Sequence, residues 1–111
     1  MPGPINTALT LPSGLTIPNR LVKAAMTEGL ADQKNRATER HATLYGRWAD
    51  GGIGLQITGN VQVDKRHLER PGNIVIDGQP SNEEIARLKA LSDAARRGGG
   101  KVIMQLSHAG R

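Results

Sequence analysis

Hydrophobic residues recur with the spacing of an α-helix in two stretches of the chain. In residues 38–50, apolar side chains fall three and four positions apart; Thr38 can cap the start and Gly51-Gly52 ends the pattern. The second stretch opens with Ser81, in a Ser-Asn-Glu-Glu capping box that Glu84 completes. Its predicted buried side consists of Ile85, Leu88, Leu91, Ala94 and Ala95. We therefore expect two amphipathic helices.

Short apolar runs between these helices are typical of β-strands. Alternating residues at 8–11 and 15–18 flank a Pro/Gly turn and predict a small hairpin. Three longer strands are predicted over residues 20–26, 53–58 and 101–106. Because these strands alternate with the helices, the pattern favours βαβ units and a parallel sheet, which makes this an α/β chain.

The remaining segments are connections. Residues 27–36 are polar and without a period, and predict a loop; the long connection 61–80 contains a candidate extra strand at 73–76. After the third strand only residues 107–111 remain, so no helix follows to cover it. Parallel sheets are normally covered on both faces. We therefore expect residues 1–111 to be the N-terminal part of a larger domain, apparently truncated.

Composition narrows the function classes. The 15 Lys and Arg residues outnumber the 10 Asp and Glu residues, but the two signs are interspersed and no aromatic residue stands among the basic ones, so nucleic-acid binding is not expected. The absence of cysteine excludes a disulfide framework or thiolate metal site. No His, Asp or Glu cluster has metal-ligand spacing. No run has the length of a membrane span, and the first seven residues lack a signal pattern, so we expect a cytoplasmic protein.

Candidate chemistry follows the ends of the predicted strands. The segments Ala25-Met26-Thr27 and Gly59-Asn60 and the residue Gln105 lie there. Gln105 lies within an apolar run, and a buried amide needs partners, which favours an inward-facing role. Without further context Thr27 would be read as a loop hydroxyl, and His41 and His67 as helix packing and loop surface.

Three motifs resemble the Old Yellow Enzyme family of FMN-dependent flavoproteins. They are Pro-Asn-Arg-Leu-Val-Lys-Ala-Ala-Met-Thr at 18–27, Gly-Ile-Gly-Leu-Gln-Ile-Thr-Gly-Asn at 52–60 and Met-Gln-Leu-Ser-His-Ala-Gly-Arg at 104–111. They occur in family order and at family spacing, and the resemblance covers almost the whole chain. It implies the N-terminal portion of a (β/α)₈ TIM barrel, namely the hairpin plus about three βα units.

The resemblance implies a flavin-binding set of Ala25, Met26, Thr27, Gly59, Asn60 and Gln105. In this set the backbone of Ala25 and Met26 lies against the isoalloxazine ring. Thr27 is the catalytic residue, bonding near O4 and N5 and raising the electron affinity of the ring. Gln105 bonds N3 and O2, and Asn60 lies near the pyrimidine edge. Two positions depart from the family: Ala25 replaces the usual Pro, and Asn60 a Gly or Ala.

The implied reaction is the reduction of FMN by NAD(P)H, followed by hydride transfer to an electron-poor alkene such as an α,β-unsaturated carbonyl. The resemblance places the substrate-binding pair, the proton donor and the phosphate site beyond Arg111, which itself would shape the rim of the site. His108 is not expected to carry the main chemistry. A small-molecule substrate is the expected partner; a homo-oligomer of the full-length form stays open.

Other interpretations remain at this point. A related flavin barrel, such as a dienoyl-CoA reductase or an amine dehydrogenase, would share these motifs. A non-catalytic remnant, or a subdomain that pairs with another chain, would retain them without using them. For the isolated chain we expect weak FMN binding or none, and no activity.

Overall fold

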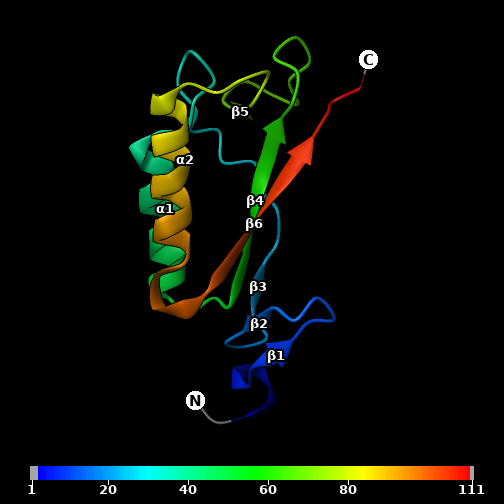
Figure 1. The fold of residues 1–111 in the computed structure, drawn as a ribbon, viewed down its shortest axis with the longest axis vertical. Coiled ribbons are helices and arrows are strands. Elements are labelled where there is room, and N and C mark those ends of the chain that lie inside the picture. Colours follow the sequence, from blue (N-terminus) through cyan, green and yellow to red (C-terminus); the bar gives the residue numbers. More distant parts are fainter. Residues whose placement is uncertain (1–2, 111) are drawn as a thin grey trace.

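Two helices, α1 (Glu39–Asp50) and α2 (Asn82–Ala95), pack together on one face of a parallel sheet (Figure 1). The computed structural model describes residues 3–110. The strands are β1 (Leu9–Thr10), β2 (Thr16–Ile17), β3 (Val22–Lys23), β4 (Leu55–Gln62), β5 (Ile74–Val75) and β6 (Lys101–Ser107). The 3₁₀ turns are η1 (Pro4–Asn6) and η2 (Arg97–Gly99). Among the described residues no helix is long and apolar enough to cross a membrane.

Strand β4 is the centre of the main sheet. It pairs in parallel with β3, β5 and β6. The pairing with β6 runs from Leu55 to Gln62, so β6 occupies one edge of β4 over its whole length. Strands β3 and β5 must therefore share the other edge, β3 at the start of β4 and β5 at its end. The predicted hairpin is also present, with β1 and β2 antiparallel beside the amino ends of the long strands (Figure 1).

The two predicted helix starts are confirmed. Ser81 accepts a hydrogen bond from the Glu84 amide at 3.1 Å, and the Glu84 carboxylate accepts one from the Ser81 amide at 3.4 Å. At α1 the N-cap residue is Thr38, whose amide donates to Nδ1 of His41 at 3.0 Å. Each cap satisfies an amide that the first helical turn would leave unpaired.

The core lies between the helices and the sheet. Its buried members are Ala37, Tyr45, Val61, Ile74, Leu91 and Ala95. A buried amide joins these layers, because Nε2 of Gln56 donates to the carbonyl oxygens of Tyr45 in α1 and Ala95 in α2, at 3.1 and 3.4 Å. Gln56 therefore points toward the helices, and its neighbour Ile57 toward the opposite face, which we call the open face.

Three details of the sequence prediction are wrong. The second long strand does not end at residue 58 but continues to Gln62, because β5 and β6 supply hydrogen-bonding partners for its last residues. The first long strand, predicted over residues 20–26, is regular over only Val22–Lys23. Ile85 is 46% exposed, since it belongs to the first turn of α2 and the helix joins the core only from Leu88 onward.

A carboxylate ties the long loop after β3 to α2. Asp32 accepts hydrogen bonds from the backbone and side chain of Arg36 at 2.9 Å and from Nη1 of Arg87 at 3.1 Å. Burial alone would raise the pKa of Asp32, but the bonds from Arg36 and the Lys34 amide outweigh it and lower the pKa to about 2. The folded state thus favours the charged form, so its contribution is present above pH 4 and is lost as the pH falls toward 2.

We therefore expect Asp32→Asn to lower the melting temperature by several degrees at pH 7 and by much less at pH 2. Thermal unfolding followed by circular dichroism at both pH values measures this. Asp50→Asn is the matched control, because it removes an ion pair whose carboxylate is 62% exposed and should change little at either pH. An equal loss for Asp32→Asn at both pH values would contradict the assignment.

Candidate functional site

A β-bulge interrupts the pairing of the two longest strands. Ile57 of β4 is opposite Ile103 of β6, but the next aligned pair is Asn60 and Gln105. Three steps along β4 thus correspond to two along β6, which leaves one extra residue in β4. Because side chains alternate along a strand, the extra residue brings Asn60 to the same face as Ile57 and Gln105. In a regular ladder Asn60 would point toward the helices.

The two carboxamides of the pair lie on the open face. Their neighbours Val61 and Met104 line a cavity of about 190 Å³ against α2, and therefore point toward the helices. Asn60 is half-buried and Gln105 is exposed. Within residues 3–110 neither amide side chain has a hydrogen-bond partner. Each offers a donor and an acceptor to a molecule that approaches this face.

The expected burial of Gln105 is not observed. Its side chain does lie on the face away from the helices, but β6 pairs only with β4 among the described strands and nothing described covers the open face. For the same reason Ile103, on the same face, is 44% exposed. The site residues therefore form a surface in this chain, not an enclosed pocket.

The segment Ala25-Met26-Thr27 runs past the bulge. The carbonyl oxygen of Met26 lies against Gly59, in the space that a Cβ atom at Gly59 would need. Met26 itself is 52% exposed. The structure thus brings Met26 beside Gly59 and Asn60 beside Gln105. Gly59 and Asn60 were expected just beyond the strand and instead lie inside β4, at the bulge.

Thr27 is engaged on the side of the loop that follows β4. Its hydroxyl donates to Oε2 of Glu69 at 3.1 Å. Burial alone would raise the pKa of Glu69, but hydrogen bonds from Arg70, Thr27 and Asn73 outweigh it and hold the pKa below its usual value. Glu69 therefore stays ionised and accepts the hydrogen bond from the Thr27 hydroxyl. Since a hydroxyl has one proton, Thr27 in this arrangement can accept a further hydrogen bond but not donate one.

Behind the bulge lies a buried polar cluster that the sequence did not predict. The Gly59 amide donates to Oε2 of Glu28 and to the Tyr45 hydroxyl, both at 3.2 Å. The Tyr45 hydroxyl in turn donates to Oε2 of Glu28. Burial raises the pKa of Tyr45, and the hydrogen bond to Glu28 raises it further, so the phenol keeps its proton. The one sequence signal for this cluster is a lysine, Lys23, within an apolar strand.

Lys23 extends from β3 over the aromatic rings of α1. Its Nζ lies 5.0 Å from the ring centroid of Tyr45 and 4.9 Å from that of Trp48, and it has no hydrogen-bond partner within the described residues. Burial lowers the pKa of Lys23, and the nearby charge of Glu28 partly offsets this. The same carboxylate thus interacts with the lysine, the tyrosine and the bulge.

A second side chain completes the hydrogen bonding at the bulge. Oγ1 of Thr58 accepts a hydrogen bond from the backbone amide of Gln105 at 3.0 Å and donates one to the Gly59 carbonyl oxygen at 2.9 Å. The backbone groups that the bulge removes from the ladder therefore have side-chain partners. A bulge satisfied in this way is a stable feature of β4.

None of the three histidines, all within the described residues, forms a hydrogen bond to these carboxamides. His41 is fully buried in α1, and burial lowers its pKa. His67 and His108 are exposed, with ring centroids 5.5 Å apart, and Nε2 of His108 is 3.5 Å from Asp64. These positions agree with the packing and surface roles expected for His41 and His67. Arg111, expected at the rim, lies outside the described residues.

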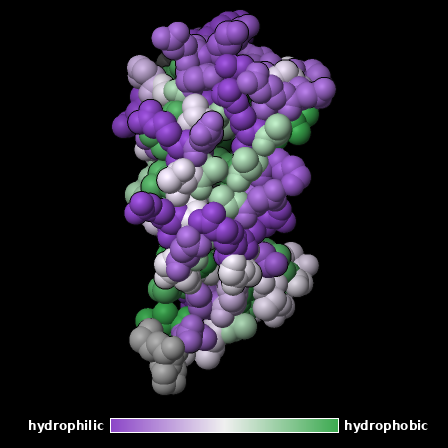
Figure 2. Space-filling model, turned by 90° about the vertical axis from the view of Figure 1, so that its left-hand side faces the viewer, coloured by the Kyte–Doolittle hydropathy of each residue, from purple (hydrophilic) through white to green (hydrophobic). Residues whose placement is uncertain are grey.

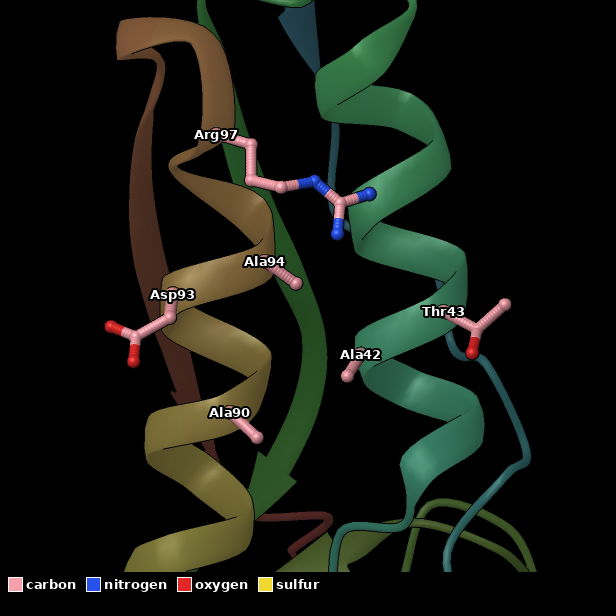
Figure 3. A pocket seen from close by; sticks show the side chains of 6 residues that line it. All are labelled: Ala42, Thr43, Ala90, Asp93, Ala94 and Arg97. Carbon is pink, nitrogen blue, oxygen red and sulfur yellow. The ribbon is translucent and has the colours of Figure 1, made fainter.

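A groove lies elsewhere, on the outer side of the helices. Ala42, Ala90 and Ala94 point into the gap between α1 and α2, and Arg97 reaches across it (Figure 3). The guanidinium group of Arg97 bonds Asp50 at 2.8 and 3.1 Å. The surrounding surface is mainly hydrophilic (Figure 2). Because the groove offers methyl groups and an ion pair already formed, we do not assign it a function.

Comparison with known proteins gives matches over nearly the whole chain. Residues 7–111 match the model of the NADH:flavin oxidoreductase / NADH oxidase family. The chain is 41% identical over 104 residues to an NADH-dependent flavin oxidoreductase of Hypocrea jecorina, and 35% over 102 residues to an NADH:fumarate oxidoreductase of Klebsiella pneumoniae. These alignments cover 93% and 92% of the chain. The chain spans only 26% and 11% of the two relatives.

The fold also matches solved structures over nearly the whole chain. The old yellow enzyme homologue from Zymomonas mobilis superimposes with a TM-score of 0.81 and 25% identity. The match covers 98% of this chain and 29% of that one.

Proposed function

The chain belongs to the NADH:flavin oxidoreductase / NADH oxidase family, and from this premise we propose that its open face forms one side of an FMN site. The match to the old yellow enzyme homologue confirms the predicted fold class, the N-terminal portion of a (β/α)₈ barrel. In such barrels the carboxyl ends of the strands carry the chemistry. The observation that carries the proposal is the pairing of Asn60 with Gln105 on the open face.

The residues present fit a flavin ring. The pyrimidine edge of the ring alternates carbonyl and N–H groups, and a carboxamide bonds such an edge with its donor and acceptor together. Gln105 and Asn60 supply two adjacent carboxamides without internal partners, beside a glycine that holds the strand close to the Met26 backbone. Gln105 would bind N3 and O2, and Asn60 the neighbouring part of the edge. Ala25 and Met26 would contact the ring through their backbone.

Thr27 would act on the ring only after its hydroxyl leaves Glu69. Bound FMN would supply hydride transfer, and a hydroxyl donated toward the ring would raise its electron affinity. In the described arrangement this proton is held by Glu69 at 3.1 Å. We propose that Thr27 turns from Glu69 to the ring when the flavin binds, so that Glu69 controls how readily the hydroxyl is released.

For the whole protein we propose NAD(P)H as the reductant and an electron-poor alkene, such as an α,β-unsaturated carbonyl, as the small-molecule substrate. The support is family membership together with the relative named for fumarate, an alkene conjugated to carboxyl groups. The residues that would hold the substrate and supply a proton are not among those assigned to this chain.

A second candidate is a subdomain that pairs with another polypeptide segment. The outer edge of β6, which pairs with no described strand, favours it, because Ile103, Met104 and Leu106 are 44%, 40% and 63% exposed. Such a subdomain would retain the fold without binding flavin by itself. The flavin titration below distinguishes the two.

Titration of the ¹⁵N-labelled chain with FMN tests the proposal. We expect weak binding, because the residues assigned here contact the ring and none grips the phosphate. Chemical shifts should change at the amides of Gly59, Asn60 and Gln105. Gln105→Ala should weaken binding by roughly two- to tenfold, the contribution of one or two hydrogen bonds.

Gln33→Ala is the matched control, since Gln33 is exposed in the loop after β3 and should leave binding unchanged. Chemical-shift changes confined to other surfaces would overturn the assigned site. No chemical-shift change at all would favour the second candidate, a subdomain that pairs with another polypeptide segment. Binding at low micromolar affinity would contradict the expectation that ring contacts alone are available.

A further inference from the structure

The bulge in β4 leaves one amide without a partner in the sheet. On one edge, the register with β6 passes from Ile57 directly to Asn60, so neither Thr58 nor Gly59 has an aligned residue opposite it. On the other edge, β3 pairs only with Leu55 and Gln56, and β5 only from Val61 onward. Gly59 is buried, and a buried amide without a hydrogen bond is strongly unfavourable. This amide therefore depends on side chains.

Glu28 and Tyr45 supply those side chains from two different elements. Glu28 comes from the loop after β3 and Tyr45 from the middle of α1. Each accepts a hydrogen bond from the Gly59 amide at 3.2 Å. The Tyr45 hydroxyl donates to the same carboxylate oxygen. Tyr45 is fully buried, so the ring cannot leave without opening the core. The three groups form a closed triangle behind the open face.

The triangle also determines where the segment before Glu28 lies. A Cβ atom at Gly59 would lie 2.6 Å from Oε1 of Glu28 and against the Met26 carbonyl oxygen, so the loop backbone and the strand are in direct contact here. Holding Glu28 thus fixes Met26 and Thr27 beside the bulge. One carboxylate orders both the loop and the strand that carry the assigned flavin contacts.

We propose that Glu28 and Tyr45 are positioning residues that hold the β4 bulge and thereby keep Asn60 beside Gln105 on the open face. Without them the Gly59 amide loses its partners, and a regular ladder, with Gly59 opposite Gln105 and Asn60 turned toward the helices, becomes competitive. Their effect on flavin binding rests on the function proposed above. Their effect on the bulge does not.

The variants Tyr45→Phe and Glu28→Gln test this inference in the 111-residue chain. Both keep the shape of the side chain and remove one hydrogen-bonding group. Amide hydrogen exchange measured by NMR should accelerate at Gly59 about tenfold more than at the other protected amides, with nuclear Overhauser contacts between the side chains of Asn60 and Gln105 weakened. FMN affinity should fall severalfold in the same variants.

Ser81→Ala is the control, because it removes the cap of α2, which has no hydrogen bond to the bulge residues, and destabilises the chain by a general route. It should accelerate exchange throughout the protected amides without singling out Gly59, and should leave the contacts of Asn60 unchanged. A purely structural role for Glu28 and Tyr45 predicts the same uniform pattern in their variants, and that result would overturn the proposal.

The two proposals fail in different ways. If the unmodified chain gives no shift changes with FMN, the proposed flavin site fails, while exchange at Gly59 still decides whether the triangle holds the bulge. If FMN binds at Gly59, Asn60 and Gln105 but Tyr45→Phe and Glu28→Gln bind it equally well, the positioning role is wrong and the flavin site stands.

Discussion

Replacing Tyr45 by alanine should destabilise the chain more than any other single truncation, by about 4 kcal/mol or more. Removing a buried aromatic ring costs roughly 3–5 kcal/mol through lost burial and the cavity left behind. Here the ring also lies beneath Nζ of Lys23 and packs edge-on against Trp48 at 5.3 Å between centroids. Its loss would leave the buried Lys23 and the half-buried Glu28 with fewer partners, which adds to the cost.

Urea unfolding followed by circular dichroism would measure this effect. Tyr45→Phe is the matched control, because it keeps the ring and removes only the hydroxyl that bonds Glu28 and the Gly59 amide. It should cost about 1–2 kcal/mol. A loss below about 1 kcal/mol for Tyr45→Ala would show that α1 and β3 repack without the ring, and would contradict the assigned core.

Gly59→Ala should be the second most damaging change, at about 3 kcal/mol. Its backbone lies against the Met26 carbonyl oxygen and Oε1 of Glu28, the latter 2.6 Å from the position of a new Cβ. The Met26 oxygen belongs to the backbone and cannot rotate away, so β4 and the loop must separate. The effect should therefore include a change in the open face, visible as shifted resonances of Asn60 and Gln105.

Gly51→Ala provides the control for this substitution. A Cβ at Gly51 would lie 3.4 Å from its nearest neighbour, the Trp48 carbonyl oxygen, and the residue has helical backbone angles with φ −76°. Unfolding in urea should therefore give nearly the stability of the original chain. If both glycine variants lost the same free energy, crowding at the bulge would not be the cause.

The helices could be predicted from the sequence because their signals are local. Both helix signals depend only on residues that are close in sequence. They are the capping box at Ser81 and Glu84 and the apolar spacing of residues 38–50. The alternation of strands and helices likewise gave the parallel sheet. The family motifs placed Met26, Gly59, Asn60 and Gln105 in one region, and the structure brings them together as two adjacent pairs.

The rest could not be predicted because it depends on contacts between distant segments. The bulge follows from how β4 aligns with β6, and nothing in the composition of residues 53–62 distinguishes it from a turn. The Gly59 amide finds Glu28 and Tyr45, 31 and 14 residues away in sequence. The hydrogen bond from Thr27 to Glu69 spans 42 residues, and only the folded chain reveals that this hydroxyl is already engaged.

The two faces of the sheet formed by β4 and β6 have different roles, and this difference has an evolutionary consequence. Gln56, Thr58 and Val61 hold the helices and the bulge, whereas the side chains of Asn60 and Gln105 have no hydrogen-bond partner among the described residues. Mutations at Asn60 or Gln105 can therefore explore new ligand chemistry at little cost in stability, while those at the first three are constrained. Selection can diversify the open face while the framework beneath it stays the same, which makes this fold a permissive starting point for new specificities.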